Sequence, residues 1–234
     1  MLSRRQILSV AAAIPATAIL GEGQASAAVP FIRTDFTVRE FGPALFIGDS
    51  TTSGYRSNLV LQLRDTTLGP YRFDLGPVRS MTKSTRVMYS GVEAVRRARA
   101  AGFEPKVVVF GVGANDLRYG IRTPELARQA FDPLVGEAGP DVTVGILNLY
   151  SPRATRSSRI AAFNRYLEEA TTRWPNLVIV DWASLARRNR RWHKADGVHY
   201  NMSGARHRNT FMIQSLIDVC VKHDELNPPE PPPV

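Results

Sequence analysis

The sequence predicts an α/β fold in which helices cover both faces of a central parallel sheet. Short runs of apolar residues alternate along the chain with longer stretches whose apolar residues recur at helical spacing. This alternation is typical of repeated strand–helix–strand units. The short runs are nearly continuous in apolar character, as expected for parallel strands that are buried on both faces. Because no internal repeat and no Gly/Ser-rich linker divides the chain, we expect one domain over residues 40–223.

Four short apolar runs are the predicted strands. Val107–Phe110 is the clearest, because it combines three valines with a phenylalanine, and β-branched and aromatic side chains are enriched in strands. The other three have the same apolar character and span residues 44–47, 142–149 and 177–180.

Four longer stretches are the predicted helices, because their apolar side chains fall on one helical face. They span residues 91–101, 123–131, 158–174 and 205–222. In the second of them, Thr123 followed by Pro124 is a favourable helix start. The apolar stretch 59–64 is compatible with either a helix or a strand.

Both ends of the sequence are predicted to lie outside the domain. Residues 1–27 have the features of an export signal, because two adjacent arginines precede an apolar stretch and Ala25–Ala27 offers the small residues that a signal peptidase accepts. The paired arginines resemble a twin-arginine signal, so we expect an exported or envelope-associated protein. A membrane anchor that is not cleaved is the alternative. We interpret residues 28–39 as an extension, and residues 224–234, with five prolines among the last eight, as a disordered tail.

Composition excludes several classes of protein. With 44% hydrophobic and 22% charged residues among 234, the chain is neither wholly disordered nor fibrous. Its single cysteine, Cys220, excludes an internal disulfide framework and a multi-cysteine metal site. We expect Cys220 to be a buried small apolar residue of the last helix.

The chain is basic, with 30 Lys and Arg against 21 Asp and Glu and a net charge of +9. Removing residues 1–27, which contain two Arg and one Glu, changes this to +8. The basic residues are scattered and no nucleic-acid motif occurs, so we expect no nucleic-acid partner. Contact with an anionic envelope surface is the partner that this charge favours. The densest basic run, residues 187–194, is either a solvated face or the rim of an anion-binding site.

Ser50 is the first residue with the features of a catalytic group. Ligands of such sheets gather at the carboxyl ends of the strands, and Ser50 follows the first predicted strand in the turn Gly48–Thr51. A serine there can present its hydroxyl to a cleft as a nucleophile, and a backbone N–H at a helix start can stabilise an oxyanion. The alternative is that Ser50 only caps a helix.

Asn115 follows the predicted strand Val107–Phe110 in a glycine-rich block, Gly111–Asp116. The glycines allow a sharp turn close to a ligand, and the side-chain amide of Asn115 is a neutral donor of the kind that an oxyanion hole needs. The alternative is a turn in which Asn115 adopts a left-handed conformation.

Asp196 and His199 supply the remaining groups that serine catalysis requires. A serine nucleophile needs a general base, and the base needs an orienting acid. An aspartate three residues before a histidine reaches the imidazole within one local turn, fixing its tautomer. His193 and His207 are rivals for the role of base, but the first lies in the basic run and the second between two arginines.

Together these three blocks resemble the SGNH branch of the GDSL hydrolases, over residues 44–215. The resemblance implies a three-layer α/β/α sandwich of the flavodoxin-like type and an ester-hydrolysing activity. It also implies that Ser50 is the nucleophile, that the Ser50 N–H and Asn115 contribute to the oxyanion hole, and that Asp196 and His199 are the acid and base.

The family has one more oxyanion donor, the N–H of a glycine between the first and third blocks. Gly76 and Gly91 are the candidates for this position. Pro77 restricts the conformation of Gly76, and Gly91 precedes a predicted helix that it could simply cap. The stretch 78–80 could fill the position without a glycine.

We therefore expect an exported serine hydrolase that cleaves carboxylic esters through an acyl-enzyme and needs no metal or organic cofactor. Its substrate would be a small-molecule ester or an ester of the cell envelope. Two alternatives stay open: an esterase or acyltransferase acting on acylated envelope carbohydrate, and a non-catalytic envelope-binding module. Four aromatic residues could line a sugar or acyl cleft or belong to the core: Tyr55, Tyr119, Tyr150 and Trp192.

Overall fold

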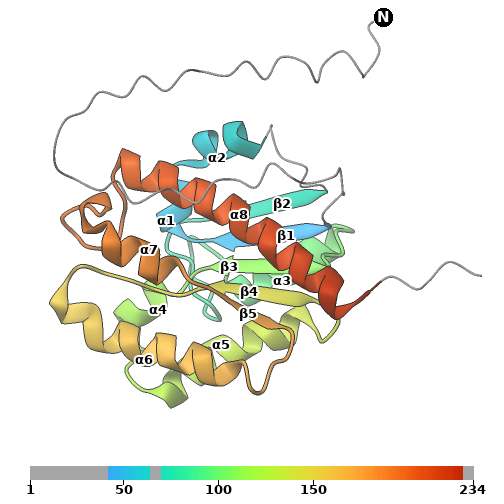
Figure 1. The fold of residues 1–234 in the computed structure, drawn as a ribbon. Helices are drawn as coiled ribbons and strands as arrows, with labels where there is room; N and C mark the ends of the chain where they lie inside the picture. Colours follow the sequence, from blue (N-terminus) through green and yellow to red (C-terminus); the bar gives the residue numbers. More distant parts are fainter. Residues whose placement is uncertain (1–41, 64–69, 229–234) are drawn as a thin grey trace, which may run out of the picture.

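Five parallel strands form the centre of the fold (Figure 1). The computed structural model describes residues 42–63 and 70–228, so the predicted export signal, the extension and the end of the tail lie outside the described residues. The strands are β1 (Ala44–Gly48), β2 (Tyr71–Leu75), β3 (Val107–Gly111), β4 (Thr143–Leu147) and β5 (Leu177–Val180). Their order in the sheet is β2-β1-β3-β4-β5 and every pairing is parallel.

The four predicted strands are confirmed, and the structure adds β2. All residues of β1, β3 and β4 are buried, as their apolar character predicted. β2, one of the two edge strands, was not predicted. Its first two residues are exposed, and it contains Arg72 and Asp74, so it lacks the continuous apolar run of a central strand.

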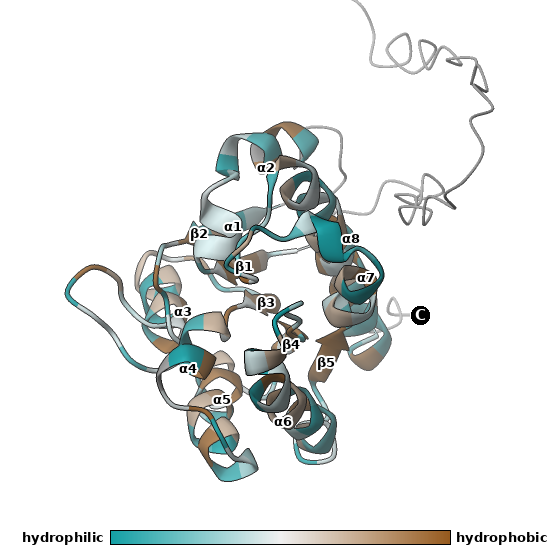
Figure 2. Ribbon diagram, turned by 90° about the vertical axis from the view of Figure 1, so that its left-hand side faces the viewer, coloured by the Kyte–Doolittle hydropathy of each residue, from teal (hydrophilic) through white to brown (hydrophobic). Residues whose placement is uncertain are grey.

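Helices cover both faces of this sheet, as predicted (Figures 1 and 2). One apolar cluster lies between the sheet and α3 (Gly91–Ala100), α5 (Pro124–Ala138) and α6 (Ala154–Ala170). A second cluster lies between the opposite face and α2 (Arg56–Leu63), α7 (Trp182–Arg188) and α8 (Met202–Leu226). Two shorter helices, α1 (Ser50–Ser53) and α4 (Ala114–Tyr119), directly follow β1 and β3.

The four predicted helices are confirmed as α3, α5, α6 and α8. The apolar stretch 59–64, which was compatible with either a helix or a strand, begins within α2. Two of the four predicted helices are longer than expected. α5 continues past Pro133 to Ala138, because Leu134, Val135 and Ala138 extend its buried stripe into the core. α8 continues to Leu226, three residues beyond the expected end of the domain. Cys220 is buried in α8, as predicted.

None of the described helices is both long enough and apolar enough to cross a membrane.

Because all five strands are parallel, their carboxyl ends lie at the same edge of the sheet. The turns after β1 and β3 therefore lie next to each other, since these two strands are paired from Ala44 with Val107 to Gly48 with Gly111.

Candidate active site

The turn after β1 presents Ser50 beyond the edge of the sheet. Asp49 is the N-cap of α1, and its Oδ1 accepts hydrogen bonds from the N–H of Thr51 (2.9 Å) and the hydroxyl of Thr51 (2.7 Å). Ser50 is therefore the first residue of the helix rather than its cap, and its hydroxyl is not used for capping. Gly48 is needed before this turn, because a Cβ there would lie 2.8 Å from a methyl group of Leu75.

His199 lies against the hydroxyl of Ser50, although the two residues are far apart in the sequence. Ser50 Oγ is 3.0 Å from His199 Nε2, and His199 Nδ1 is 2.7 Å from Asp196 Oδ2. Both distances are within hydrogen-bonding range. The structure thus brings the three predicted residues together in the nucleophile–base–acid order that serine catalysis requires.

A tight loop fixes Asp196 relative to His199. The other carboxylate oxygen of Asp196, Oδ1, accepts hydrogen bonds from the N–H groups of Val198 (2.8 Å) and His199 (2.9 Å). Gly197, between Asp196 and Val198, has a positive φ of 67°. Partial burial raises the pKa of Asp196, but the hydrogen bonds from His199 and from these N–H groups outweigh it and lower the pKa to about 2. The carboxyl group is consequently ionised at neutral pH and can stabilise an imidazolium.

The two rival histidines do not contact Ser50. The ring of His193 packs between Tyr150 and Tyr200, and His207 stacks on Trp192 with ring centroids 4.4 Å apart. Burial lowers the pKa of both imidazoles. Both are therefore packing residues in the described part of the chain.

Asn115 lies in the first turn of α4, after the turn at the end of β3. The left-handed conformation that we considered for Asn115 belongs instead to Gly113, which has a φ of 116°. One N–H of the Asn115 amide donates to the carbonyl of Arg79 (3.0 Å). A side-chain amide has two N–H donors. The second N–H of Asn115 has no partner among the described residues, so it can donate to a ligand.

Neither glycine that we considered for the third oxyanion donor has a free amide. The N–H of Gly76 donates to Gly48 O (3.1 Å), and the N–H of Gly91 donates to Ser80 O (2.9 Å). Gly91 is the first residue of α3, and Ser90 caps that helix. The remaining candidate for the third oxyanion donor is a backbone N–H of residues 78–80. In this stretch, the carbonyl of Arg79 accepts the hydrogen bond from Asn115.

Asp116 holds that same stretch in place, a role not predicted from the sequence. Both of its carboxylate oxygens accept the N–H of Met81, at 3.0 and 3.2 Å. Burial raises the pKa of Asp116 to about 6. Its position directly after Asn115 was the signal in the sequence that could have identified it.

Arg208 of α8 supports the turn that carries Ser50. Its side chain is 3% exposed, donates to Thr51 Oγ1 (3.2 Å) and lies over the rings of Trp182 and Tyr200. Burial raises the pKa of Asp49, whereas the hydrogen bonds from Thr51 and the positive charge of Arg208 lower it. No local pattern in the sequence indicates this role, because Arg208 approaches the turn only in the folded chain.

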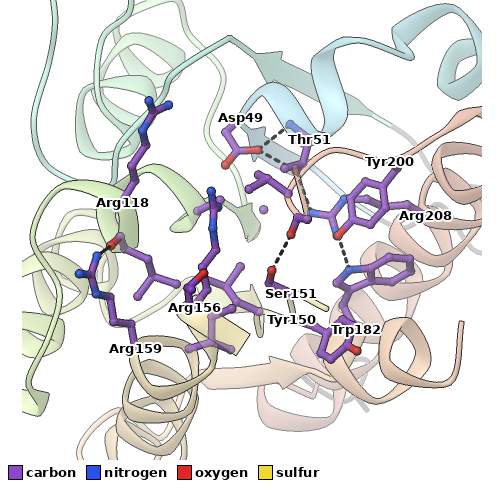
Figure 3. A pocket seen from close by; sticks show the side chains of 18 residues that line it. Asp49, Thr51, Arg118, Tyr150, Ser151, Arg156, Arg159, Trp182, Tyr200 and Arg208 are labelled. Atoms are coloured by element: carbon purple, nitrogen blue, oxygen red, sulfur yellow. Dashed lines mark hydrogen bonds between the residues drawn. The ribbon is translucent and has the colours of Figure 1, made fainter. Parts of the chain in front are cut away.

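A pocket opens beside the turn that carries Ser50 (Figure 3); the four predicted site residues are not part of its lining. It has a volume of about 240 Å³. Asp49 and Thr51, which flank Ser50, and Val198, which precedes His199, line one part of it; Tyr150 and Trp182 line another. Tyr55 and Trp192 are not among the lining residues: the first hydrogen-bonds to Tyr200 O and the second is buried in the core. The side chain of Tyr119 lies outside the described part of the structure.

Residues 46–207 match the sequence profile of the GDSL-like Lipase/Acylhydrolase family. The chain belongs to this family. The match includes Ser50, Asn115, Asp196 and His199, and it confirms the resemblance to the GDSL hydrolases. Membership supports a hydrolase of the esterase type. None of the curated proteins compared with the chain matches it significantly.

Solved structures confirm the fold of this family member. The C-terminal catalytic domain of the peptidoglycan O-acetyltransferase OatA of Streptococcus pneumoniae superimposes with a TM-score of 0.58 and 17% identity, covering 76% of this chain and 94% of that one. TesA gives a TM-score of 0.55 at 18% identity, covering 75% and 98%. A family 3 carbohydrate esterase of Clostridium thermocellum gives 0.53 at 18%, covering 76% and 96%. The three-layer α/β/α sandwich implied by the resemblance is thereby confirmed.

Proposed function

We propose that the protein is an exported serine hydrolase that cleaves carboxylic esters through an acyl-enzyme on Ser50. The observation that carries this proposal is the continuous chain of contacts from Ser50 Oγ to His199 Nε2 (3.0 Å) and from His199 Nδ1 to Asp196 Oδ2 (2.7 Å). A serine, a histidine and an ionised aspartate in this order can generate a nucleophile at neutral pH. Export rests only on the sequence of residues 1–27.

In the first half-reaction, His199 Nε2 accepts the proton of the Ser50 hydroxyl while Oγ attacks the ester carbonyl. Asp196 accepts the hydrogen bond of Nδ1–H and stabilises the imidazolium that forms. The tetrahedral intermediate collapses by breaking the bond to the alcohol oxygen, and the imidazolium donates its proton to that oxygen. In the second half-reaction, His199 takes a proton from water as the water oxygen attacks the acyl carbonyl. The second tetrahedral intermediate collapses by breaking the bond to Ser50 Oγ, which regains its proton from His199, and the carboxylic acid is released.

The negative charge of the tetrahedral intermediate needs donors that are already in position. The Ser50 N–H at the start of α1 and the free N–H of the Asn115 amide are two of them. We assign the third to a backbone N–H of residues 78–80. Two hydrogen bonds hold this stretch against α4, one from Asn115 to Arg79 O and one from Met81 N–H to Asp116.

The size of the pocket favours a short acyl group or a compact alcohol. Its volume of about 240 Å³ is below the usual range of ligand pockets, which is about 300–1,000 Å³. A long acyl chain would extend beyond it. Tyr150 in its wall also suits a sugar ring, which favours the second candidate, an esterase or acyltransferase acting on acylated envelope carbohydrate. The names of the OatA and carbohydrate esterase structures are consistent with that candidate.

The test is hydrolysis of p-nitrophenyl esters, from acetate to longer acyl chains, by the purified protein and by Ser50→Ala. We expect turnover that is highest for the short chains and is lost in the variant. Turnover that persists in Ser50→Ala would refute the acyl-enzyme. A folded protein without activity on these esters would next be offered an O-acetylated carbohydrate, with and without an acceptor sugar. If it also left that substrate unchanged, it would be a binding module.

A further inference from the structure

The pocket beside Ser50 carries an excess of positive charge. Four arginines line it: Arg118, Arg156, Arg159 and Arg208. The only acidic residue in its lining is Asp49, whose pKa is raised by burial. Lys and Arg are seldom placed together around a small cavity without an anionic partner, because their charges repel each other in a region of low dielectric constant. The lining of this pocket is therefore suited to an anion.

Arg156 is the arginine best placed to bind one. Its guanidinium group points from α6 into the middle of the pocket, toward the side where Asp49 lies (Figure 3). The side chain is half-buried and forms no hydrogen bond or ion pair with any residue that the structure describes. Asp49 forms no ion pair with it among the described residues, and the arginine whose charge acts on that carboxyl group is Arg208.

Arg159 lies one helical turn further along α6 and shares the same face as Arg156. One of its terminal nitrogens, Nη1, donates to the carbonyl of Leu117 (3.1 Å), which fixes the guanidinium group at the edge of the pocket. A guanidinium group has five N–H donors, so others remain for a ligand. On the opposite side of the pocket Arg208 is held by Thr51, Trp182 and Tyr200 and adds a fixed positive charge.

We propose that this pocket binds an anionic group, a carboxylate or a phosphate, on the non-reacting part of the ester substrate, with Arg156 as the main ligand. The proposal rests on the proposed function, because the pocket adjoins Ser50 and His199 through Asp49, Thr51 and Val198. The planar fork of a guanidinium group matches the two oxygens of either anion. The substrate class is then an ester that carries a negative charge beside the acyl bond.

The first experiment measures anion binding without catalysis. Isothermal titration calorimetry with succinate and with inorganic phosphate, at constant ionic strength, is performed on the full chain carrying Ser50→Ala. We expect at least one of the two to bind, and the tighter one distinguishes a carboxylate from a phosphate ligand. In the double variant Ser50→Ala/Arg156→Gln, binding should be weaker by about tenfold or more, because a charge-assisted hydrogen bond is lost. In the double variant Ser50→Ala/Arg96→Gln, the affinity for the anion should be unchanged, since Arg96 is exposed on α3 and pairs with Glu137.

The second experiment compares two esters of similar size, p-nitrophenyl butyrate and mono-p-nitrophenyl succinate, which differ in the terminal carboxylate. We expect the ratio of kcat/KM for the charged over the neutral ester to exceed one, to fall about tenfold or more in Arg156→Gln, and to stay at the wild-type value in Arg96→Gln. Thermal unfolding checks that both variants are folded.

These outcomes separate the two proposals. Hydrolysis of the neutral ester, with no anion binding and no preference for the charged ester, would refute the anion site and leave the serine hydrolase intact. Anion binding that depends on Arg156, with no turnover of the p-nitrophenyl esters or of the O-acetylated carbohydrate, would refute the hydrolase and retain the anion site. A preference for the charged ester that survives in Arg156→Gln would refute the assignment of Arg156.

Discussion

Replacing Asn115 by alanine tests the oxyanion hole more directly than any other single change. The structure gives its amide two roles, one N–H holding the carbonyl of Arg79 (3.0 Å) and one left for the substrate. The substitution removes both. We expect kcat for p-nitrophenyl acetate to fall about 10²–10³-fold, because removing one oxyanion donor has that effect in enzymes of this kind, while KM changes little.

The stability effect of the same substitution should be small by comparison. One hydrogen bond between neutral groups contributes about 0.5–1.5 kcal/mol, and a change of about 1 kcal/mol shifts Tm by about 2–4 °C in a domain of this size. The loss of activity corresponds to about 2.7–4 kcal/mol. Catalysis should therefore be affected much more than folding.

Asn176→Ala is the matched control. The Asn176 amide also donates to backbone carbonyls, those of Gly139 (3.1 Å) and Val142 (2.7 Å), outside the pocket lining. It should lower Tm at least as much as Asn115→Ala and leave kcat unchanged. The assay is steady-state kinetics together with thermal unfolding of both variants. If kcat of Asn115→Ala stayed within about threefold of the wild type, well below the expected effect of a lost donor, the role of Asn115 would be refuted.

Three further predictions concern acidic and thiol groups. Asp196→Asn should reduce kcat by about 10⁴-fold, because the wrong tautomer of His199 is then favoured; steady-state kinetics would contradict this if the loss were below tenfold. The folded protein binds the proton of Asp116 more tightly than the unfolded chain, since burial raises its pKa from 3.8 to about 6. Stability should therefore fall by up to about 3 kcal/mol as pH rises from about 4 to about 7. In Asp116→Asn, whose amide oxygen can still accept the N–H of Met81, urea unfolding at several pH values should show a flatter dependence than in the wild type; identical curves would contradict the assignment. Burial raises the pKa of Cys220 to about 12, so a thiol reagent should label it only after unfolding, and rapid labelling of the native protein would be inconsistent with its buried position.

The central strands could be predicted because each one is buried on both faces and so has a continuous apolar run. The edge strand β5 could also be predicted, because Leu177–Val180 is entirely apolar, whereas the edge strand β2 could not, because it begins with two exposed residues and includes Arg72 and Asp74. The helices α4 and α7 were also missed. They have six and seven residues, too few for an apolar periodicity to be visible. A helix start at Ser50 was considered from the turn after the first strand, and α1 begins there.

The residues brought together at the site could be predicted because each has a local signal, a polar residue directly after a strand or an Asp three residues before a His. The third oxyanion donor could not, because any residue can supply a backbone N–H. Of the two glycines considered for that donor, Gly91 has a role in packing. A Cβ at Gly91 would lie 2.8 Å from Leu134 Cδ2, so this glycine is required by the packing of α3 on α5. Arg156 and Arg159 were not singled out, because their convergence on the pocket depends on how α6 is placed.

The contacts of α8 determine when the candidate active site can be assembled during synthesis. Ser50, Asp196 and His199 all precede this helix, yet the turn that carries Ser50 is held by α8 through Arg208 on Thr51 and Met212 on Thr52. A nascent chain that has emerged from the ribosome only as far as His199 contains all three residues and lacks the helix that holds this turn. We therefore expect the site to form only after residues 202–226 have been released and packed.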